Sequence, residues 1–544
     1  MCCGSGTSPL IKYRRRNLPV ASRPIRGFGG KSEPAGISIA RGANMSFRHP
    51  WMRTPNTAST RIGRLQEPGG IVNAITNIGT DTDPEAAKAA EIFSIIAKDL
   101  LEDVDRPELW AAFPQFLAAV PGLPEQARTA LQVYARQDPA MVQAAVIVLA
   151  LAAAHGGAVA DAIGLLTPLL AVNPQSPLVT GVMFYLQGMA DPANPKYRLE
   201  GKICPVPFQR LEVLETSSHL CCASFLKPTI GDLQTASDWR DVWNSESAEA
   251  IRASMHDGSY RYCDKLACPA IQSDGLIPAS QLADRSSAWK KVVEGRETKV
   301  DRGPEEVNLA YDRTCNLSCP SCRAAPYAAD EATRTRYDAL QERIILPMLK
   351  DARRVTITGS GDPFASKNFR RLMERLTPEA YPALKFHVMT NGMLFTPREW
   401  ARFPALHGRV ELLSISLDGA SAETHEALRR GARWDVMEQN LAFAGELRRQ
   451  GHIDAFHLGF VVQAENYHEM GEMISLCERV GADRVYFGRI TNWGTFSQAE
   501  YTRKAVFLPE HPDHHHFLAA MADPRLQDAR AGIGNLGDFL PEIV

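Results

Sequence analysis

The chain has 544 residues, of which 45% are hydrophobic, and a formal net charge of −2. This length is too great for one ordinary domain, and the near-neutral total excludes a protein that is basic throughout. The charge is uneven, because residues 1–66 carry twelve Lys or Arg and one acid, Glu33, a net of +11 that leaves −13 on the remainder. No export signal and no run of about 18 apolar residues is apparent, so we expect a cytoplasmic protein without a membrane span.

The first 198 residues divide into a basic arm and a helical region. Residues 1–83 are rich in Arg, Gly, Pro and Ser without periodicity, which predicts a disordered arm. It lacks interleaved aromatic residues, so we do not expect it to bind nucleic acid. The segment 84–198 is rich in Ala and Leu and predicts an α-helical domain. Ala162–Val172, followed by Asn173-Pro174, resembles part of a tetratricopeptide (TPR) hairpin, whose concave face would bind a peptide or protein; a plain helical bundle is the alternative.

From residue 304 the pattern is that of an α/β fold. Strand-like and helix-like segments alternate to about residue 500, which predicts parallel strands joined by right-handed crossovers. Six such units are visible and a standard barrel needs eight, so we expect an open, partial (β/α)6 barrel over 304–500. The polar segment 276–303 predicts a linker, and 501–544 a helical C-terminal extension. The six expected strands are Val307–Tyr311, Arg354–Thr358, Lys385–Thr390, Val410–Leu417, Ala455–Val462 and Arg484–Ile490.

Three cysteines follow the first of these strands at once. Cys315, Cys319 and Cys322 are separated by three and two residues. Their thiolates can converge from one short loop, hold three corners of a cubane cluster and leave the fourth iron without a protein ligand. A structural zinc site would require a fourth thiol or a His close by, and the next thirty residues contain neither. The spacing therefore favours an iron–sulfur cluster with an open position.

This Cys-x3-Cys-x2-Cys loop resembles that of the radical S-adenosylmethionine (SAM) superfamily. The resemblance implies a [4Fe–4S] cluster on Cys315, Cys319 and Cys322, with SAM chelated to the open iron. It also implies reductive cleavage of SAM to a 5′-deoxyadenosyl radical that abstracts a substrate hydrogen. The electron would come from a reductant such as a flavodoxin or a ferredoxin.

Later motifs fall where the resemblance implies SAM contacts. Thr358 to Phe364 resembles the family's Gly-Gly-Glu-Pro turn, although Asp362 replaces the usual Glu. A turn follows the third strand, a Ser/Asp pair ends the fourth, and an arginine pair ends the next helix. Ser321 stands where the family usually has an aromatic residue beside the adenine. The SAM-binding candidates are Gly359, Ser360, Gly361, Asp362, Asn391, Ser416, Asp418 and Arg430.

A second set of cysteines lies upstream, within 199–275. The landmarks Ile230-Gly231-Asp232-Leu233, Val242-Trp243-Asn244-Ser245 and Ile251-Arg252 accompany it. Together they resemble a SPASM domain, the auxiliary iron–sulfur module of peptide-modifying radical SAM enzymes, although that module normally follows the barrel. The resemblance implies one auxiliary [4Fe–4S] cluster, with zinc as the alternative because both accept tetrahedral thiolate ligands. The candidate ligands are Cys204, Cys263, Cys268 and one of Cys221 and Cys222.

The leading functional hypothesis is a radical SAM enzyme that abstracts hydrogen from a peptide or protein side chain. A small-molecule or carbohydrate substrate is a second hypothesis. A non-enzymatic helical-repeat scaffold, or a redox sensor whose metal sites turn over no SAM, is a third. The open iron position distinguishes them, since a purely structural site has no use for it.

Overall fold

The computed structural model describes residues 110, 113–119, 122–134, 138–173 and 176–541. The basic arm predicted over 1–83, and most of the chain before Phe113, lie outside these residues. Among them, the main feature is one sheet of nine strands in the order β11-β10-β9-β8-β7-β6-β5-β2-β3. No helix in the described part of the chain has the length and apolar character needed to cross a membrane.

The six predicted strands are confirmed as the parallel centre of this sheet. Each pairs in parallel with the next in sequence, from β5 to β10. Their apolar residues are buried on both faces, as the near-continuous hydrophobic runs of parallel strands require. The sheet does not close on itself, in agreement with an open, partial barrel. The strands are β5 (Glu306–Leu309), β6 (Arg354–Ile357), β7 (Lys385–Thr390), β8 (Val410–Ser416), β9 (Phe456–Val462) and β10 (Arg484–Arg489).

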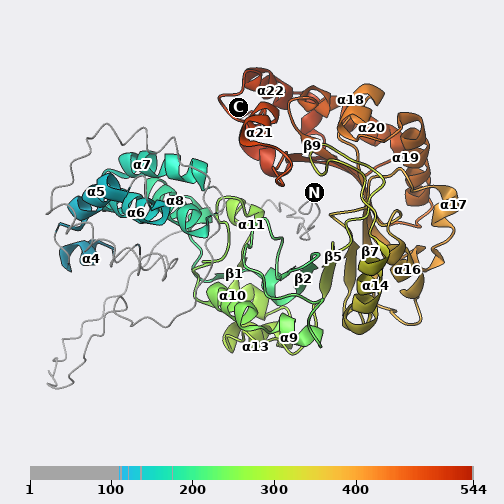
Figure 1. Ribbon diagram of the computed structural model, residues 1–544, viewed down its shortest axis with the longest axis horizontal. Helices are drawn as coiled ribbons and strands as arrows, with labels where there is room; N and C mark the ends of the chain where they lie inside the picture. The colour runs from blue at the N-terminus through green and yellow to red at the C-terminus, as the bar shows by residue number, and fades with distance from the viewer. Residues whose placement is uncertain (1–109, 111–112, 120–121, 135–137, 174–175, 542–544) are drawn as a thin grey trace, which may run out of the picture. The chain divides into compact units, whose positions relative to one another are not determined.

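The crossover helices cover the outer face of the sheet (Figure 1). Most of them begin at a polar residue whose side chain accepts a backbone N–H of the first turn, as Ser366 and Ser421 do. These caps follow directly on the loops at the strand ends, so they fix where each loop stops. The helices are α14 (Glu331–Leu340), α15 (Leu346–Met348), α16 (Lys367–Arg375), α17 (Pro397–Trp400), α18 (Ala422–Leu428), α19 (Trp434–Arg449) and α20 (Met470–Val480).

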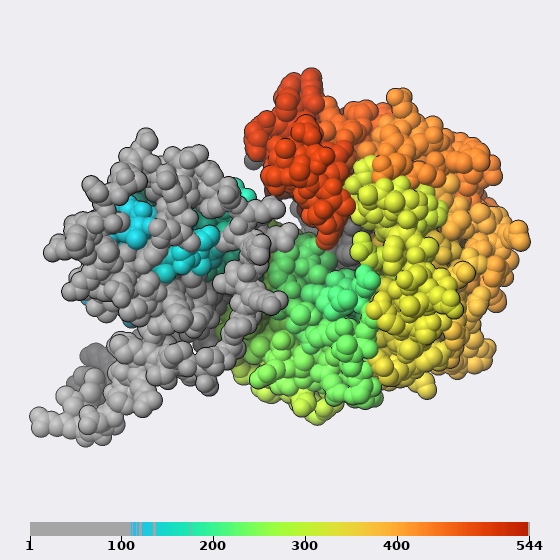
Figure 2. Space-filling view, viewed as in Figure 1, coloured from blue at the N-terminus to red at the C-terminus, as the bar shows by residue number. Residues whose placement is uncertain are grey.

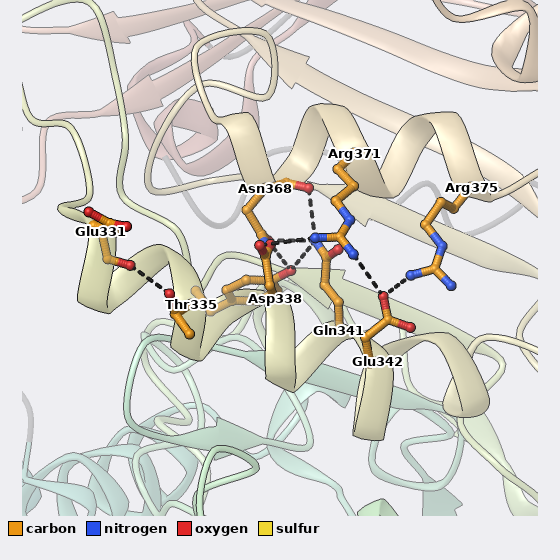
Figure 3. A network of polar contacts seen from close by, with 9 residues as sticks. Glu331, Thr335, Asp338, Gln341, Glu342, Asn368, Arg371 and Arg375 are labelled. Carbon is orange, nitrogen blue, oxygen red and sulfur yellow. Dashed lines mark hydrogen bonds and ion pairs between the residues drawn. The ribbon is translucent and has the colours of Figure 1, made fainter.

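A polar network joins the first crossover to α16 (Figure 3). Between α14 and α15 the backbone widens into a π-helical turn, Gln341–Ile345, which directs the buried Gln341 amide inward. That amide donates to the Tyr311 hydroxyl at 3.1 Å and to the Asn368 carbonyl at 2.9 Å. On the surface Glu342 accepts from Arg371 at 3.2 Å. The network thereby anchors Tyr311, the residue that leads from β5 into the three-cysteine loop.

Both edges of the sheet differ from the prediction. At one edge, residues before the predicted linker form β2 (Arg210–Val213) and β3 (Ser218–His219). Strand β2 pairs in parallel with β5, with Val213 opposite Leu309. At the other edge the C-terminal segment, predicted as helical only, contributes β11 (Ala531–Gly532) beside β10. The sequence interpretation missed these strands because each is two to four residues long and shows no alternation. In Figure 2 the green segment that contains β2 lies directly against the yellow start of the barrel, as the pairing of β2 with β5 requires.

The segment 276–303 is not a linker, and that prediction is wrong. It forms β4 (Ile277–Pro278), α12 (Ala279–Ala283) and α13 (Ser287–Glu294), and it buries Leu282 and Val292 in the core. Only a few apolar residues of this polar segment carry the packing, which is why its composition suggested a linker. We call residues 199–303 the cysteine-rich module from here on.

Arg252 lies buried inside the cysteine-rich module and connects several of its segments. Its guanidinium is fully buried, donates to the carbonyls of Pro207, Trp243 and Thr298, and lies 4.4 Å from the centre of the Trp243 ring. Burial lowers the pKa of Arg252 to about 9, and nearby Glu249 opposes the shift. Two of the landmarks in the sequence, Trp243 and Arg252, therefore have a structural role in holding the module together. The remaining helices of the module are α9 (Trp239–Trp243), α10 (Glu246–His256) and α11 (Pro269–Gln272), with β1 (Lys202–Ile203) paired to β4.

The described part of the predicted helical domain is indeed helical. Asp138 caps α6 and Ser176 caps α8, each followed by Pro at the first helical position. Consecutive helices pack on one another, but a 34-residue repeat is not evident in them, so the TPR-like assignment stays a prediction. The helices are α4 (Phe113–Ala119), α5 (Leu123–Tyr134), α6 (Pro139–His155), α7 (Val159–Val172) and α8 (Pro177–Ala190). The C-terminal helices are α21 (Gln498–Lys504) and α22 (His514–Met521).

Candidate functional site

The candidate residues gather at the carboxyl edge of the parallel sheet, where such folds place ligands. Two residues at this edge, Thr358 after β6 and Asp418 after β8, have positive φ angles of 67° and 63°. Residues with a Cβ avoid this conformation, which costs about 1 kcal/mol or more and is found mainly at functional sites. The strain marks the ends of β6 and β8 as part of the site.

The cysteine loop, residues 312–327, is closed by its own backbone. Cys315 and Tyr327 exchange two backbone hydrogen bonds of 2.8 and 3.2 Å, so the loop returns to its starting point. The N–H of Cys322 donates to the carbonyl of Cys319 at 2.9 Å. Cys315 is half-buried, Cys319 is buried and Cys322 is exposed, and all three are free thiols. The three thiols of the loop therefore differ in exposure, and the last of them, Cys322, lies at the surface.

Two arginines hold this loop against its surroundings. Arg323 donates to the carbonyl of Arg313 at 2.5 Å, to the carbonyl of Ser360, and to the Cys322 sulfur at 3.4 Å. Arg430 donates to the carbonyl and hydroxyl of Ser318, at 3.0 and 3.1 Å, and to the carbonyl of Ala324. Arg430, one of the SAM-binding candidates, thus has its guanidinium hydrogen-bonded to the cysteine loop. Arg323 was not predicted, because nothing in the sequence distinguishes it from other surface arginines.

The glycine turn, Thr358–Asp362, packs directly on the cysteine loop. A Cβ at Gly361 would lie 2.6 Å from the carbonyl oxygens of Asp312 and Thr314, so only glycine fits there. The Ser360 hydroxyl donates to the carbonyl of Ala310 at 2.5 Å. Gly361 is thus required by loop packing before any ligand is considered. The turn holds the cysteine loop in place.

The sequence suggested that Asp362 contacts SAM, but in the structure its carboxylate points into the fold. Its carboxylate is fully buried and accepts from the Thr390 hydroxyl at 2.7 Å and from the N–H groups of Asn391 and Phe364 at 2.8 and 3.0 Å. Burial raises the pKa of Asp362, and these hydrogen bonds oppose the shift. The side chain connects the ends of β6 and β7. The substitution of Asp for the family's Glu suits this inward position, because the shorter side chain stays within the fold.

Asn391 faces the cysteine loop directly. Its side-chain amide lies 3.6 Å from the Cys315 sulfur and donates to the Asn316 side chain at 2.9 Å. Its Oδ1 accepts the N–H of Met393 at 3.0 Å, which fixes the orientation of the amide. The structure therefore places a hydrogen-bond donor from the end of β7 beside the first of the three thiols.

The end of β8 reaches the second thiol through an arginine. Asp418, 1% exposed at its side chain, forms a 2.7 Å ion pair with Arg429, and Arg429 also approaches the Cys319 sulfur at 3.9 Å. Burial works against the charge of Arg429, but Asp418 and Cys319 outweigh it and raise the pKa of Arg429. Ser416, the other candidate here, is buried on β8. Arg429 is the residue that the sequence interpretation missed in favour of its neighbour; two adjacent arginines on a helix end cannot be ranked without the direction of their side chains.

The upstream cysteines also come together, as a four-thiol site of Cys204, Cys221, Cys263 and Cys268. All four are free, and burial is the main factor that raises the pKa of each thiol, that of Cys221 to about 12. The thiols also raise one another's pKa by charge repulsion: Cys263, for example, by Cys268, Cys204 and Cys221. Cys222 is buried and is not a free thiol, so of the adjacent pair Cys221 belongs to the site.

In neither set are the thiols already arranged around a position that a single metal ion could occupy. Within the part of the chain that is described, no three His, Cys, Asp or Glu side chains form a group that could hold a metal ion as they stand. The donor sets nonetheless suit soft metals, since clustered thiolates select zinc and iron–sulfur clusters, and the thiols release their protons when such a metal binds. Positive charge accompanies both sets: Arg429 lowers the pKa of Cys319, Arg210 that of Cys221 and Lys265 that of Cys263, each against the larger effect of burial.

Comparison with known proteins agrees with this geometry. Residues 312–477, from the start of the cysteine loop to α20, match the model of the radical SAM superfamily. These residues are a radical SAM domain. Members of this superfamily are enzymes and typically bind an iron–sulfur cluster and SAM. The match begins at Asp312, so it leaves the cysteine-rich module and the helical region outside it.

Curated relatives resemble the same part of the chain. An AdoMet-dependent heme synthase of Nitratidesulfovibrio vulgaris is 30% identical over 195 residues, 35% of this chain and 49% of the relative. The mycofactocin maturase MftC of Mycobacterium tuberculosis is 30% identical over 174 residues, 31% of this chain and 40% of the relative. The chain thus spans about half the length or less of these relatives.

Solved structures match a similar share of the chain. The crystal structure of Streptococcus suis SuiB bound to precursor peptide SuiA matches 39% of this chain and 45% of that chain, with 16% identity and a TM-score of 0.28.

Proposed function

We propose that this protein is a radical SAM enzyme that cleaves SAM reductively at a [4Fe–4S] cluster held by Cys315, Cys319 and Cys322. When bound, the reduced cluster supplies one electron to the sulfonium of SAM, which yields methionine and a 5′-deoxyadenosyl radical able to take a hydrogen atom from a substrate. The single observation that carries the proposal is the open set of three free thiols at the carboxyl edge of a radical SAM domain.

The residues around the thiols have distinct tasks in this proposal. The Asn391 amide and the Arg429 guanidinium lie beside Cys315 and Cys319, where donors and positive charge stabilise a thiolate-bound cluster. Arg323 and the glycine turn keep the loop closed. Gly359, Ser360 and Ser416 remain our candidates for contacts with SAM. Since Asp362, Asp418 and Arg430 are occupied by internal hydrogen bonds or ion pairs, we assign them positioning roles at the strand ends and the loop.

The four-thiol site fits an auxiliary [4Fe–4S] cluster. It offers four half-buried free thiols, enough to bind every iron of a cubane and leave none open. Such a site would relay electrons or shape the substrate pocket, whereas zinc would only stabilise the module. The landmarks shared with SPASM domains favour the cluster.

For the substrate we propose a peptide or protein side chain. The support is the resemblance of the cysteine-rich module to those of peptide-modifying enzymes, together with the maturase among the relatives. A reductant of the flavodoxin or ferredoxin class would supply the electron. A small-molecule substrate is the second candidate, and the heme synthases among the relatives favour it.

The test uses the full-length chain, reconstituted anaerobically. We expect about eight irons per chain, two clusters of four, and 5′-deoxyadenosine when dithionite and SAM are added. Cys319→Ala should abolish deoxyadenosine formation while the four-thiol site keeps its iron. Cys477→Ala is the matched control, since Cys477 is also a buried free thiol, on α20 and outside the loop, and it should leave product formation unchanged. Iron without any deoxyadenosine, with dithionite and with a flavodoxin, would support a scaffold or sensor instead.

A further inference from the structure

A buried carboxylate on β2 connects the two cysteine regions. Glu212 has no exposed surface, and each of its carboxylate oxygens accepts one hydrogen bond. One oxygen accepts the backbone N–H of Ala223 at 2.9 Å, two residues after Cys221. The other accepts the side-chain amide of Asn308, on β5, at 2.7 Å. The same side chain thus touches the turn that carries a thiol of the four-thiol site and the strand that leads to the cysteine loop.

The charge environment makes this placement unusual. Both hydrogen-bond partners of Glu212 are neutral. Its cross-strand neighbour is His219 on β3, and burial lowers the pKa of that imidazole although Glu212 opposes the shift. Transferring a carboxylate into the interior without a counter-charge is costly. Glu212 nevertheless lies beside the turn that carries Cys221, because it accepts the backbone N–H of Ala223. A neutral side chain could make the same two contacts at a lower desolvation cost.

We infer that Glu212 is a positioning residue for the four-thiol site: it holds the Cys221 turn in register with β5 and adds negative charge beside the metal centre. The parallel pairing of Glu212 with Asn308 in the sheet fixes the distance from the turn to the barrel. A nearby negative charge makes a bound cluster harder to reduce. This inference rests on the proposed auxiliary cluster, and its test separates the two.

The first variant removes the charge and keeps the shape. In Glu212→Gln the side-chain oxygen can still accept from Ala223. Its amide can donate to Asn308, whose Oδ1 is buried without a partner and becomes available when that amide turns over. We expect the reconstituted full-length variant to keep both clusters. The auxiliary midpoint potential, followed by electron paramagnetic resonance, should become less negative, while that of the radical SAM cluster stays unchanged.

The second variant removes the link. Glu212→Ala leaves the Ala223 N–H and the Asn308 amide unpaired in a buried space, so we expect iron to fall from about eight to about four per chain, with deoxyadenosine formation retained. The matched control is Glu215→Gln, three residues along the chain, whose carboxylate accepts from the Tyr337 hydroxyl at 3.4 Å. It should change neither the iron content nor the auxiliary potential.

The outcomes separate the two ideas. Unchanged potentials in Glu212→Gln, or eight irons in Glu212→Ala, would overturn the role of Glu212. A parent chain with four irons and one zinc would overturn the auxiliary cluster alone. The role of Glu212 would then be measured with cobalt(II) at the same thiols: the thiolate-to-cobalt absorption should persist in the Gln variant and be lost in the Ala variant, and equal absorption in both would overturn it.

Discussion

The two cysteine sites of this protein differ in how far they are enclosed. The loop at the end of β5 offers three thiols, one of them exposed, and borrows Asn391 and Arg429 from neighbouring strand ends. The cysteine-rich module brings together four half-buried thiols from separate segments, none of them exposed, and Glu212 ties the Cys221 turn to the sheet. Structural metal sites are closed and catalytic ones keep an open position. The comparison therefore supports our proposal of catalysis at the first site and of structural support or electron transfer at the second.

The largest effect should come from Arg252, which serves only the enclosed site. Arg252→Met leaves the carbonyls of Pro207, Trp243 and Thr298 unpaired in the core, at a cost of about 3–5 kcal/mol. We expect a lower melting temperature and loss of about four irons. Arg240→Met is the control, because Arg240 lies on the surface over the Trp239 ring. Equal iron in both variants would contradict a distinct role for Arg252.

The next effect concerns the open site. Arg429→Gln leaves Asp418 buried without its counter-charge and removes the positive charge beside Cys319. We expect deoxyadenosine formation to fall about 100-fold, which corresponds to about 2.7 kcal/mol. Arg430→Gln should cost clearly less, because Arg430 donates mainly to carbonyls of the loop. If Arg430→Gln were the more damaging change, the assignment of Arg429 would fail.

Acid should lower the stability of the barrel through His387, which lies in the first half of β7, away from the carboxyl ends of the strands that hold the site. Burial and Arg354 lower the pKa of His387 to about 4, although Glu411 opposes the shift. Since the imidazole is neutral when folded, its contribution is complete above about pH 6.5 and is lost as the pH falls toward 4. At pH 5 we expect about 2 kcal/mol less stability than at pH 7 from this residue. Urea unfolding at both pH values measures the difference. His387→Asn should reduce it, and an unreduced difference would mean that other groups cause it.

The smallest effect should distinguish the two sites kinetically. Arg323→Gln releases the exposed end of the cysteine loop, because it removes the contacts with Arg313, Ser360 and the Cys322 sulfur. We expect a chelator to extract the radical SAM iron about tenfold faster, or about 1.4 kcal/mol, while the auxiliary iron leaves at the parent rate. Arg313→Gln, which removes a half-exposed guanidinium 4.0 Å from Glu215, is the control. Equal acceleration at both sites would show general loosening.

The sequence alone predicted what depends on spacing along the chain. Three cysteines within eight residues can only be brought together by a loop, and the six strands from β5 to β10 follow from their long buried runs. Because parallel strands all end at one edge, the meeting of Cys315, Asn391 and Asp418 could also be predicted. These features are local or follow from the order of the strands.

Only the tertiary structure decided which side chains face the thiols. Arg429 and Arg430 are neighbours in the sequence, yet one reaches Cys319 and the other the carbonyls of the loop. Cys221 and Cys222 are equally close in sequence, and only Cys221 is a free thiol at the module site. The pairing of β2 with β5 brings Glu212 to Asn308 across 96 residues of chain. Such choices depend on the direction of single side chains and on packing between distant segments, and spacing along a chain carries no information on either.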